Sequence, residues 1–200
     1  MRAAVGLADE AGIESLSMRN LGAALGVEAM SLYKHVANKD DMLSGMVGLV
    51  MAEIELPASS GPWGQAVRRS AISAHEALLR HPWACSLMMM VPLGAAARTR
   101  HMDALLARLR QAGFTPEMTY RAYHVLASHV LGFTLWQIGH RLTGEGDVKL
   151  AAHFVQELPA DQYPDLALHI EQHGQPGHDG EFEFGLDLAI DGLTRVLDGQ

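Results

Sequence analysis

The sequence predicts an all-α protein, and two observations carry that prediction. Apolar residues recur three and four positions apart along most of the chain, the spacing that puts them on one face of a helix. The prolines fall near the ends of these periodic segments, and no segment alternates convincingly like a strand. The EFEFGL stretch at 181–186 comes nearest to alternation but continues directly into helical spacing. We expect roughly nine or ten helices.

Four short helices are expected first, at about residues 2–11, 18–24, 28–35 and 39–55. Gly12 ends the first helix. Ser17 and Asn38 precede the second and fourth helices, and both residue types cap helix N-termini. Asp40 and Asp41 lie in the first turn of the fourth helix, where negative charge is stabilised by the helix dipole.

A break in composition, the PASSGP stretch at 57–62, separates these helices from the rest. Further helices are expected at about residues 63–81, 84–90, 95–112, 117–142 and 182–197. Pro116 lies near the first turn of the 117–142 helix, which spans roughly 40 Å. Residues 143–180 are acidic and rich in glycine and proline, so we expect one or two helices with loops between them.

The net charge of −8 lies outside the N-terminal segment. Residues 1–39 hold four bases and four acids, whereas residues 143–187 hold one base and ten acids. An anionic partner is therefore expected at the N-terminal end and not at the acidic end. The only cysteine, Cys85, excludes an intramolecular disulfide, and no apolar run reaches membrane-spanning length. With acids at Asp9 and Glu10 in place of a signal peptide's apolar core, we expect a cytoplasmic protein.

Residues 18–36 have the pattern of a helix-turn-helix. Gly22 is small where the two helices must approach closely, and Gly26 lies in the turn, where glycine tolerates positive φ at no steric cost. Apolar residues on one side are expected to anchor both helices: Leu21, Leu25, Val27, Leu32 and Val36. The opposite side presents Ala29, Met30, Ser31, Tyr33, Lys34 and His35. In such motifs the second helix enters the major groove of DNA.

The stretch GIESLSMRNLGAALGVEAMSLYKHVANKDDML closely resembles the N-terminal domain of the TetR family of transcriptional regulators. The compact LYKHV ending and the NKDDML helix start two residues later make this match specific. The C-terminal region resembles the family more loosely, through the RHPW segment at 80–83, the long helix at 117–142 and the FEFGLDLAIDGL ending.

The resemblance implies an all-helical, homodimeric repressor. Residues 1–45 are then a three-helix helix-turn-helix domain that binds a palindromic operator in double-stranded DNA. Residues 46–200 form a larger helical-bundle domain for dimerisation and for a small-molecule effector, with 46–56 as the connecting helix. No enzymatic activity, cofactor or membrane partner is implied. Family members usually carry a basic extension before the first helix, whereas this chain begins almost inside it, so we expect modest operator affinity.

The resemblance also implies roles for individual residues. Arg19 matches a position that reaches a base or phosphate, and Lys39 one that meets the phosphate backbone. The recognition-helix positions are Ala29, Met30, Ser31, Tyr33, Lys34 and His35. Lysine charge and a tyrosine hydroxyl suit phosphates, whereas Ala29 and Met30 offer only apolar contact to a thymine methyl group. Arg19 is therefore expected to read a guanine. The alternative is that these side chains form an ordinary solvated helix face.

The C-terminal part is apolar and rich in methionine, as suits a pocket for an apolar or aromatic effector. The candidate contact residues are His75, Met88, His101, Met102, Tyr123, His124, Phe133 and Trp136. Among them the histidines and the tyrosine supply polar contacts. Simple filling of the protein core is the alternative for each of these residues.

A dimer interface is expected from the last helix and the 117–142 helix. The last helix has an apolar stripe formed by Leu186, Ala189, Ile190, Leu193 and Leu197. Its counterpart consists of Leu131, Leu135 and Ile138, and the two together can build a four-helix bundle across a two-fold axis. Packing of the same stripe within one chain is the alternative.

Three other function classes have weaker support. His169 and His173 are spaced to lie on one helix face near His178 and Asp179, but no cysteine or second motif completes a metal site. His75 and Glu76 begin a metalloprotease motif, yet Leu79 stands where its second histidine is needed. Hydrolase elbows and phosphate-binding glycine loops are missing from the sequence. A helical ligand-binding or interaction protein without DNA binding is the remaining alternative.

Overall fold

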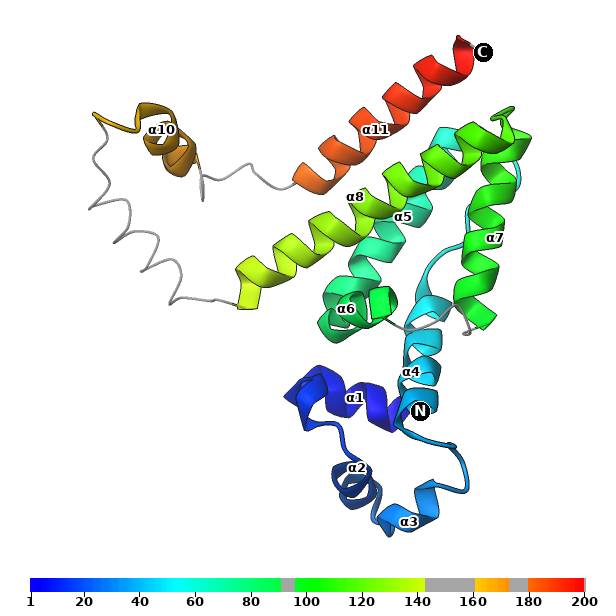
Figure 1. The fold of residues 1–200 in the computed structure, drawn as a ribbon, viewed down its shortest axis with the longest axis vertical. Coiled ribbons are helices and arrows are strands. Elements are labelled where there is room, and N and C mark those ends of the chain that lie inside the picture. Colours follow the sequence, from blue (N-terminus) through cyan, green and yellow to red (C-terminus); the bar gives the residue numbers. More distant parts are fainter. Residues whose placement is uncertain (91–95, 143–160, 173–179, 200) are drawn as a thin grey trace.

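A computed structural model describes residues 1–90, 96–142, 161–172 and 180–199, and within these ranges the chain is helical without strands (Figure 1). In order, the elements are α1 (Arg2–Ala11), the short 3₁₀ helix η1 (Ile13–Ser15), α2 (Met18–Leu25), α3 (Ala29–Leu32), α4 (Lys39–Glu53), α5 (Trp63–Arg80), α6 (Pro82–Met90), α7 (Ala96–Gln111), α8 (Pro116–Leu142), α10 (Pro164–Gln172) and α11 (Glu181–Asp198). The predicted all-α fold is confirmed.

The expected helix ends agree with local chemistry. The Ser17 side chain accepts a 3.1 Å hydrogen bond from the Asn20 amide at the start of α2, and the Asn38 side chain accepts a 2.8 Å bond from the Asp41 amide at the start of α4. Each bond satisfies an amide that has no partner within its helix. Gly12 follows α1 with φ of 78°, a conformation that favours glycine.

One core joins the N-terminal helices to the rest of the chain. It is built from α1, α2 and α3, the length of α4, the end of α5, α6, and Ile138 of α8. Ala4 and Ala8 of α1 and Trp83 and Ala84 of α6 belong to this single buried cluster. The core therefore crosses the predicted division at residues 45 and 46, with α4 running through it from the N-terminal helices to the bundle (Figure 1).

A second core lies among α5, α7, α8 and α11. α8 is the long diagonal helix of Figure 1, and α11 lies along it. The buried residues of this core are Val67, Ala71, Leu105, Leu109, Phe114, Ala122, Leu126, Phe182, Leu186, Ile190 and Leu193.

The apolar stripe expected at the dimer interface packs largely within the chain. Leu186, Ile190 and Leu193 of α11 are buried in the second core, and Ile138 of α8 is buried in the first. The alternative of intramolecular packing thus holds for these residues, because α5 and α8 cover that face of α11. A different face of α11 is exposed, with Phe184, Leu188 and Val196 spaced by multiples of four residues.

Candidate DNA-binding surface and ligand cavity

The turn between α2 and α3 depends on two glycines. A Cβ atom at Gly22 would lie 2.8 Å from the carbonyl oxygen of Val27, so only glycine fits where the chain after the turn crosses α2. Gly26 has φ of 68° and ψ of 29°, the left-handed conformation that a side chain disfavours. Both roles expected of these glycines are confirmed.

The α3 helix is shorter than expected. Regular α-helix covers Ala29–Leu32, whereas the prediction extended it over 28–35. Beyond Leu32 the chain continues as tight turns, in which the amides of Lys34 and His35 donate to carbonyls three residues earlier, at 3.3 and 2.9 Å. These turns keep Tyr33, Lys34 and His35 on the outer side, so the shorter helix still presents them to solvent.

Fewer residues than expected anchor α2 and α3 to the core. Leu21 and Leu32 are buried, and Val36 packs against the core at its edge. Leu25 and Val27 were expected in the anchor but are 47% and 45% exposed. They flank Gly26 in the turn between α2 and α3, and neither belongs to a buried cluster.

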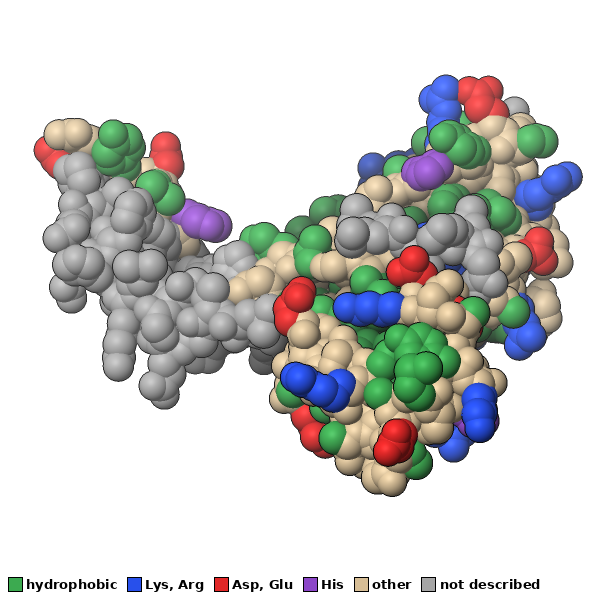
Figure 2. Space-filling model, turned by 60° about the horizontal axis from the view of Figure 1, so that its bottom comes forward, with side chains coloured by type: hydrophobic (Ala, Val, Ile, Leu, Met, Phe, Trp, Pro, Cys, Tyr) green, Lys and Arg blue, Asp and Glu red, His purple; other side chains and the backbone are tan. Residues whose placement is uncertain are grey.

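The outer side of this unit carries the predicted DNA contacts. Arg19, Tyr33, Lys34, His35 and Lys39 are exposed. Among the recognition positions the apolar Met30 is 73% exposed, and Ala29 and Ser31 are half-buried. Lys and Arg side chains (blue) and hydrophobic side chains (green) both lie on this end of the molecule, which faces the viewer in Figure 2.

Hydrogen bonds restrict the Ser31 hydroxyl and fix the backbone of Lys39. The Ser31 hydroxyl donates to the carbonyl of Glu28 at 2.7 Å, so in this conformation it can accept a hydrogen bond but cannot donate to a phosphate. Lys39 is fixed at the first position of α4, because Asn38 caps the helix while the Asp41 carboxylate accepts the Ala37 amide at 2.9 Å. These two hydrogen bonds fix the Lys39 backbone in the first turn of α4.

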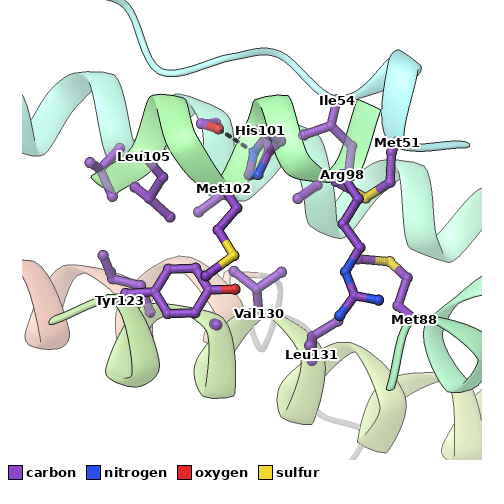
Figure 3. Close-up of a pocket in the computed structure, with 16 residues that line it drawn as sticks. Met51, Ile54, Met88, Arg98, His101, Met102, Leu105, Tyr123, Val130 and Leu131 are labelled. Atoms are coloured by element: carbon purple, nitrogen blue, oxygen red, sulfur yellow. Dashed lines mark hydrogen bonds between the residues drawn. The ribbon is translucent and has the colours of Figure 1, made fainter. Parts of the chain in front are cut away.

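The described part of the C-terminal region contains an apolar cavity of about 700 Å³, open solvent at its mouth included. Residues of α4, α5, α6, α7 and α8 line it, together with Ile54 directly after α4 (Figure 3). The lining comprises Met51, Ile54, Val67, Ser70, Ala71, Ala74, Met88, Arg98, His101, Met102, Leu105, Tyr123, Leu126, Ala127, Val130 and Leu131. A few polar groups among many apolar ones are typical of ligand pockets.

Four of the eight predicted effector contacts line this cavity, namely Met88, His101, Met102 and Tyr123. The other four lie elsewhere. His75 is buried in the second core, where its ring stacks on Phe182 at 3.9 Å and Nδ1 pairs with the Thr134 hydroxyl at 2.7 Å. Phe133 packs against that same core.

His124 and Trp136 are exposed on the outer side of α8. Helical spacing identified the apolar faces of this helix but not the element that covers each face. Sequence reasoning also missed Met51, Ile54 and Arg98, because the connecting helix and an isolated arginine carry no pocket signal of their own.

His101 is connected to the end of α4 by a short chain of hydrogen bonds. Its Nε2 lies 3.1 Å from the Ser70 hydroxyl, which donates to the Glu55 carbonyl at 2.7 Å. The Glu55 amide in turn donates to the Ser73 hydroxyl at 2.9 Å, so α5 holds the peptide of Glu55 on both sides. Because the single hydroxyl hydrogen of Ser70 goes to Glu55, Nε2 of His101 must be the donor to Ser70. Burial lowers the pKa of His101, which favours this neutral form.

The alternative metal site has only one of its residues in the described structure. His169 is exposed on α10, whereas His173, His178 and Asp179 lie outside the described residues. Within the described ranges, three or more histidine, cysteine, aspartate or glutamate side chains are nowhere grouped to hold a metal ion. The described helices also include none that is both long and apolar enough to cross a membrane.

Comparisons with known proteins agree with this architecture. The family described as "Bacterial regulatory proteins, tetR family" matches residues 1–46, and the family described as "Tetracyclin repressor-like, C-terminal domain" matches residues 56–197. An HTH-type transcriptional regulator of Saccharopolyspora erythraea is 34% identical, over 97% of this chain and 82% of that protein. The HTH-type transcriptional repressor DrrR1 of Streptomyces coeruleorubidus is 31% identical, over 98% and 76%.

A solved structure shares the fold along nearly the whole chain. The TetR family protein ActR of Streptomyces coelicolor, in complex with actinorhodin, is 28% identical with a TM-score of 0.81, covering 98% of this chain and 95% of that one. The names of these relatives indicate transcriptional regulators. The chain belongs to the TetR family of bacterial regulatory proteins and is a DNA-binding transcriptional regulator.

Proposed function

We propose that the protein is a homodimeric repressor that leaves a palindromic operator when a small, largely apolar effector enters the cavity. The observation that carries this proposal is the position of α4. Its first residue, Lys39, lies on the predicted DNA-binding surface, and Met51 near its other end lines the cavity. One helix therefore connects the two sites.

The packing of α4 supports mechanical coupling between them. Met42, Met46, Val47 and Val50 of α4 are buried in the core shared with α1, so a displacement of α4 must carry the N-terminal helices with it. An effector that pushes on Met51 tilts α4 and changes the spacing of the two recognition units in the dimer. The units then no longer match half-sites one helical turn apart.

The relatives support both halves of the proposal. DrrR1 is named a transcriptional repressor, and ActR was solved with the small molecule actinorhodin. For this chain we divide the functions as residues 1–45 for DNA binding and 46–200 for effector binding and dimerisation. Release requires the effector to bind the DNA-incompetent state more tightly than the competent one.

On the DNA side, Tyr33, Lys34 and Lys39 hold phosphates, and Met30 makes apolar contact with bases. Their exposure supports these roles. The bonded hydroxyl of Ser31 is left with an accepting role, so direct readout by hydrogen bonds falls mainly to Arg19.

A second copy of the chain fits the exposed faces of α8 and α11. Phe184, Leu188 and Val196 make an unpartnered apolar stripe on α11, and Leu135 and Trp136 are exposed on α8. The exposed glycines Gly132 and Gly192 have no atom within 4 Å of a Cβ position, so these faces leave room for close approach of another helix. A four-helix bundle across a two-fold axis would cover both stripes.

Binding to DNA from the region upstream of the protein's own gene tests the DNA-binding surface. Tyr33→Ala and Lys39→Ala should each weaken binding without unfolding the protein, and loss of Lys39 should reduce the log–log salt slope by about 0.9. Arg110→Ala removes an exposed charge at the end of α7 and is the control. If Tyr33→Ala and Lys39→Ala both bind DNA as tightly as the parent, the assignment of this surface is wrong.

The effector half is tested by a thermal-shift screen of apolar metabolites and drugs, followed by operator release. A ligand of the cavity should raise the melting temperature and weaken operator binding together. Replacing Ala74, a lining residue, with leucine should reduce both effects. A ligand that stabilises the protein yet leaves operator affinity unchanged contradicts the coupling through α4.

A further inference from the structure

The cavity has a simple electrostatic composition. Among the described residues that line it, Arg98 is the only aspartate, glutamate, lysine or arginine. Its side chain enters from the first turn of α7 and extends toward Leu131 of α8 in Figure 3, with Met51 and Met88 beside it. A permanently charged group is thus held in largely apolar surroundings.

His101 does not add a second positive charge. Its Nε2–H donates to Ser70, and the neutral form of the ring is the one favoured by burial. The Tyr123 ring lies at the other end of the labelled lining from Arg98 (Figure 3). The cavity therefore has a cationic end at Arg98 and an uncharged end at Tyr123 and Leu105, with Met102 and Val130 between them.

This distribution discriminates between ligands by charge. A cationic ligand would meet a like charge at Arg98. A neutral ligand that fills the cavity would strip water from the guanidinium without replacing the lost solvation. A carboxylate compensates that loss through charge-assisted hydrogen bonds. Arg98 already interacts within the protein, but a guanidinium offers several N–H donors and can bind a carboxylate alongside an existing acceptor.

We propose that the effector is an apolar, ring-containing carboxylate that places its anionic group on Arg98 and its ring between Met102 and Val130, toward Tyr123. This inference rests on the proposed role of the cavity as the effector site. It adds the chemical class of the ligand and its orientation, with Arg98 as the residue that determines specificity.

The test compares three probes that share one ring system and differ in charge: 2-naphthoate, 2-naphthamide and 2-naphthylmethylammonium. Affinities for the full chain are measured by calorimetry at neutral pH. We expect the carboxylate to bind at least about tenfold more tightly than the amide, the gain of one charge-assisted interaction. The ammonium probe should bind most weakly of the three.

Variants of Arg98 assign the preference to this residue. Arg98→Gln should abolish the preference for carboxylate over amide while amide binding persists, and Arg98→Lys should restore part of it. Arg100→Gln, which alters an exposed arginine on the same helix, should behave like the parent. Circular dichroism checks that each variant is folded, and Arg98→Lys keeps the test decisive if the glutamine variant fails to fold.

Three results would overturn the inference: an amide that binds as tightly as the carboxylate, a preference that survives Arg98→Gln, or a carboxylate that does not bind at millimolar concentration. The proposed function fails differently. It fails if the parent chain does not bind its upstream DNA, or if cavity ligands of every charge leave that binding unchanged. Operator release by a neutral ligand alone would retain the proposed function and reject the carboxylate class.

Discussion

Nδ1 of His81 lies 2.8 Å from Oδ1 of Asp9, a contact that joins the residue between α5 and α6 to α1. The same carboxylate oxygen accepts a 2.6 Å hydrogen bond from Nε1 of Trp83, and Nε2 of His81 lies 3.3 Å from a carboxylate oxygen of Glu53 in α4. His81 and Trp83 are both buried. The RHPW segment thus fixes α1 against α4 and α6, and with it the orientation of the helix-turn-helix.

Replacing Asp9 with alanine should weaken the contact between α1 and the RHPW segment. The Trp83 N–H and His81 would lose their shared acceptor, so we expect the free energy of unfolding to fall by about 1–3 kcal/mol. Operator affinity should fall as well. Chemical denaturation and fluorescence anisotropy with an operator duplex measure the two effects. Glu10→Ala changes an exposed acid on the same helix and is the control; equal losses in both variants would rule out a special role for Asp9.

Gly22→Ala should destabilise the DNA-binding end. The added Cβ would lie 2.8 Å from the Val27 carbonyl oxygen, and because that oxygen belongs to the backbone, relief requires the turn to move. We expect a loss of about 1–3 kcal/mol, typical of overpacking, and weaker DNA binding. Gly6→Ala in α1 has open space around its Cβ and should be neutral or stabilising, in line with helix propensity. Thermal melts of the two variants decide whether close packing is the cause.

The pH dependence of stability should contain a contribution from His101. Burial lowers its pKa below the ordinary 6.5, so the unfolded chain takes up this proton at a higher pH than the folded protein does. The stability from this group is complete above pH 6.5 and is lost as the pH falls through the folded pKa. His101→Gln should therefore flatten the unfolding free energy below pH 6.5, whereas His124→Gln on the exposed side of α8 should not.

Glu53 makes a separate contribution to the pH dependence of stability, at more acidic pH. The hydrogen bond from Arg80 holds the pKa of this carboxyl below its ordinary 4.5, so its contribution persists above 4.5 and is lost as the pH falls through the folded pKa. This contribution should be the same in the parent and in His101→Gln. Identical pH profiles of the two proteins between 4.5 and 6.5 would contradict the assignment to His101.

Arg19→Ala should lower sequence discrimination more than overall affinity. Arg19 is exposed on α2. The roles proposed for Met30, Tyr33 and Lys34 are apolar and phosphate contacts. A bidentate arginine–guanine contact is worth about 1–3 kcal/mol, so the ratio of operator to scrambled-DNA affinity should fall roughly tenfold. Competition titrations at fixed salt measure the ratio. Lys34→Ala should instead weaken binding to operator and scrambled DNA alike. If Lys34→Ala lowered the ratio and Arg19→Ala weakened binding to both sequences, then Lys34 would read the base and Arg19 would hold the phosphate.

Leu188→Glu should convert the protein to a monomer. Leu188 is 57% exposed on the apolar face of α11, so a carboxylate there costs the folded monomer little but would be buried without a partner in a dimer. Light scattering coupled to gel filtration gives the mass. Leu56→Glu introduces the same charge at a site of comparable exposure after α4 and should leave the oligomeric state unchanged. A dimeric Leu188 variant would place the interface elsewhere.

Most of the helix ends and the turn between α2 and α3 were predictable because they depend on neighbours in the chain. Ser17 and Asn38 cap helices whose amides lie three residues away, and Gly26 determines its own φ. The length of α3 was not predictable, because the tight turns at 33–35 follow the same apolar spacing as a helix.

The cavity and the exposed face of α11 were decided by the tertiary structure. Apolar spacing marked one stripe on α11, but α5 and α8 cover Leu186 and Ile190 and leave Leu188 outside. Likewise, Met51 and Arg98 meet at one cavity although they belong to different helices. The sequence by itself determined the helices and their caps, and it predicted the DNA-binding surface, since these depend on short-range interactions. Which faces are buried, and which side chains share a cavity, depends on packing between helices far apart in the chain.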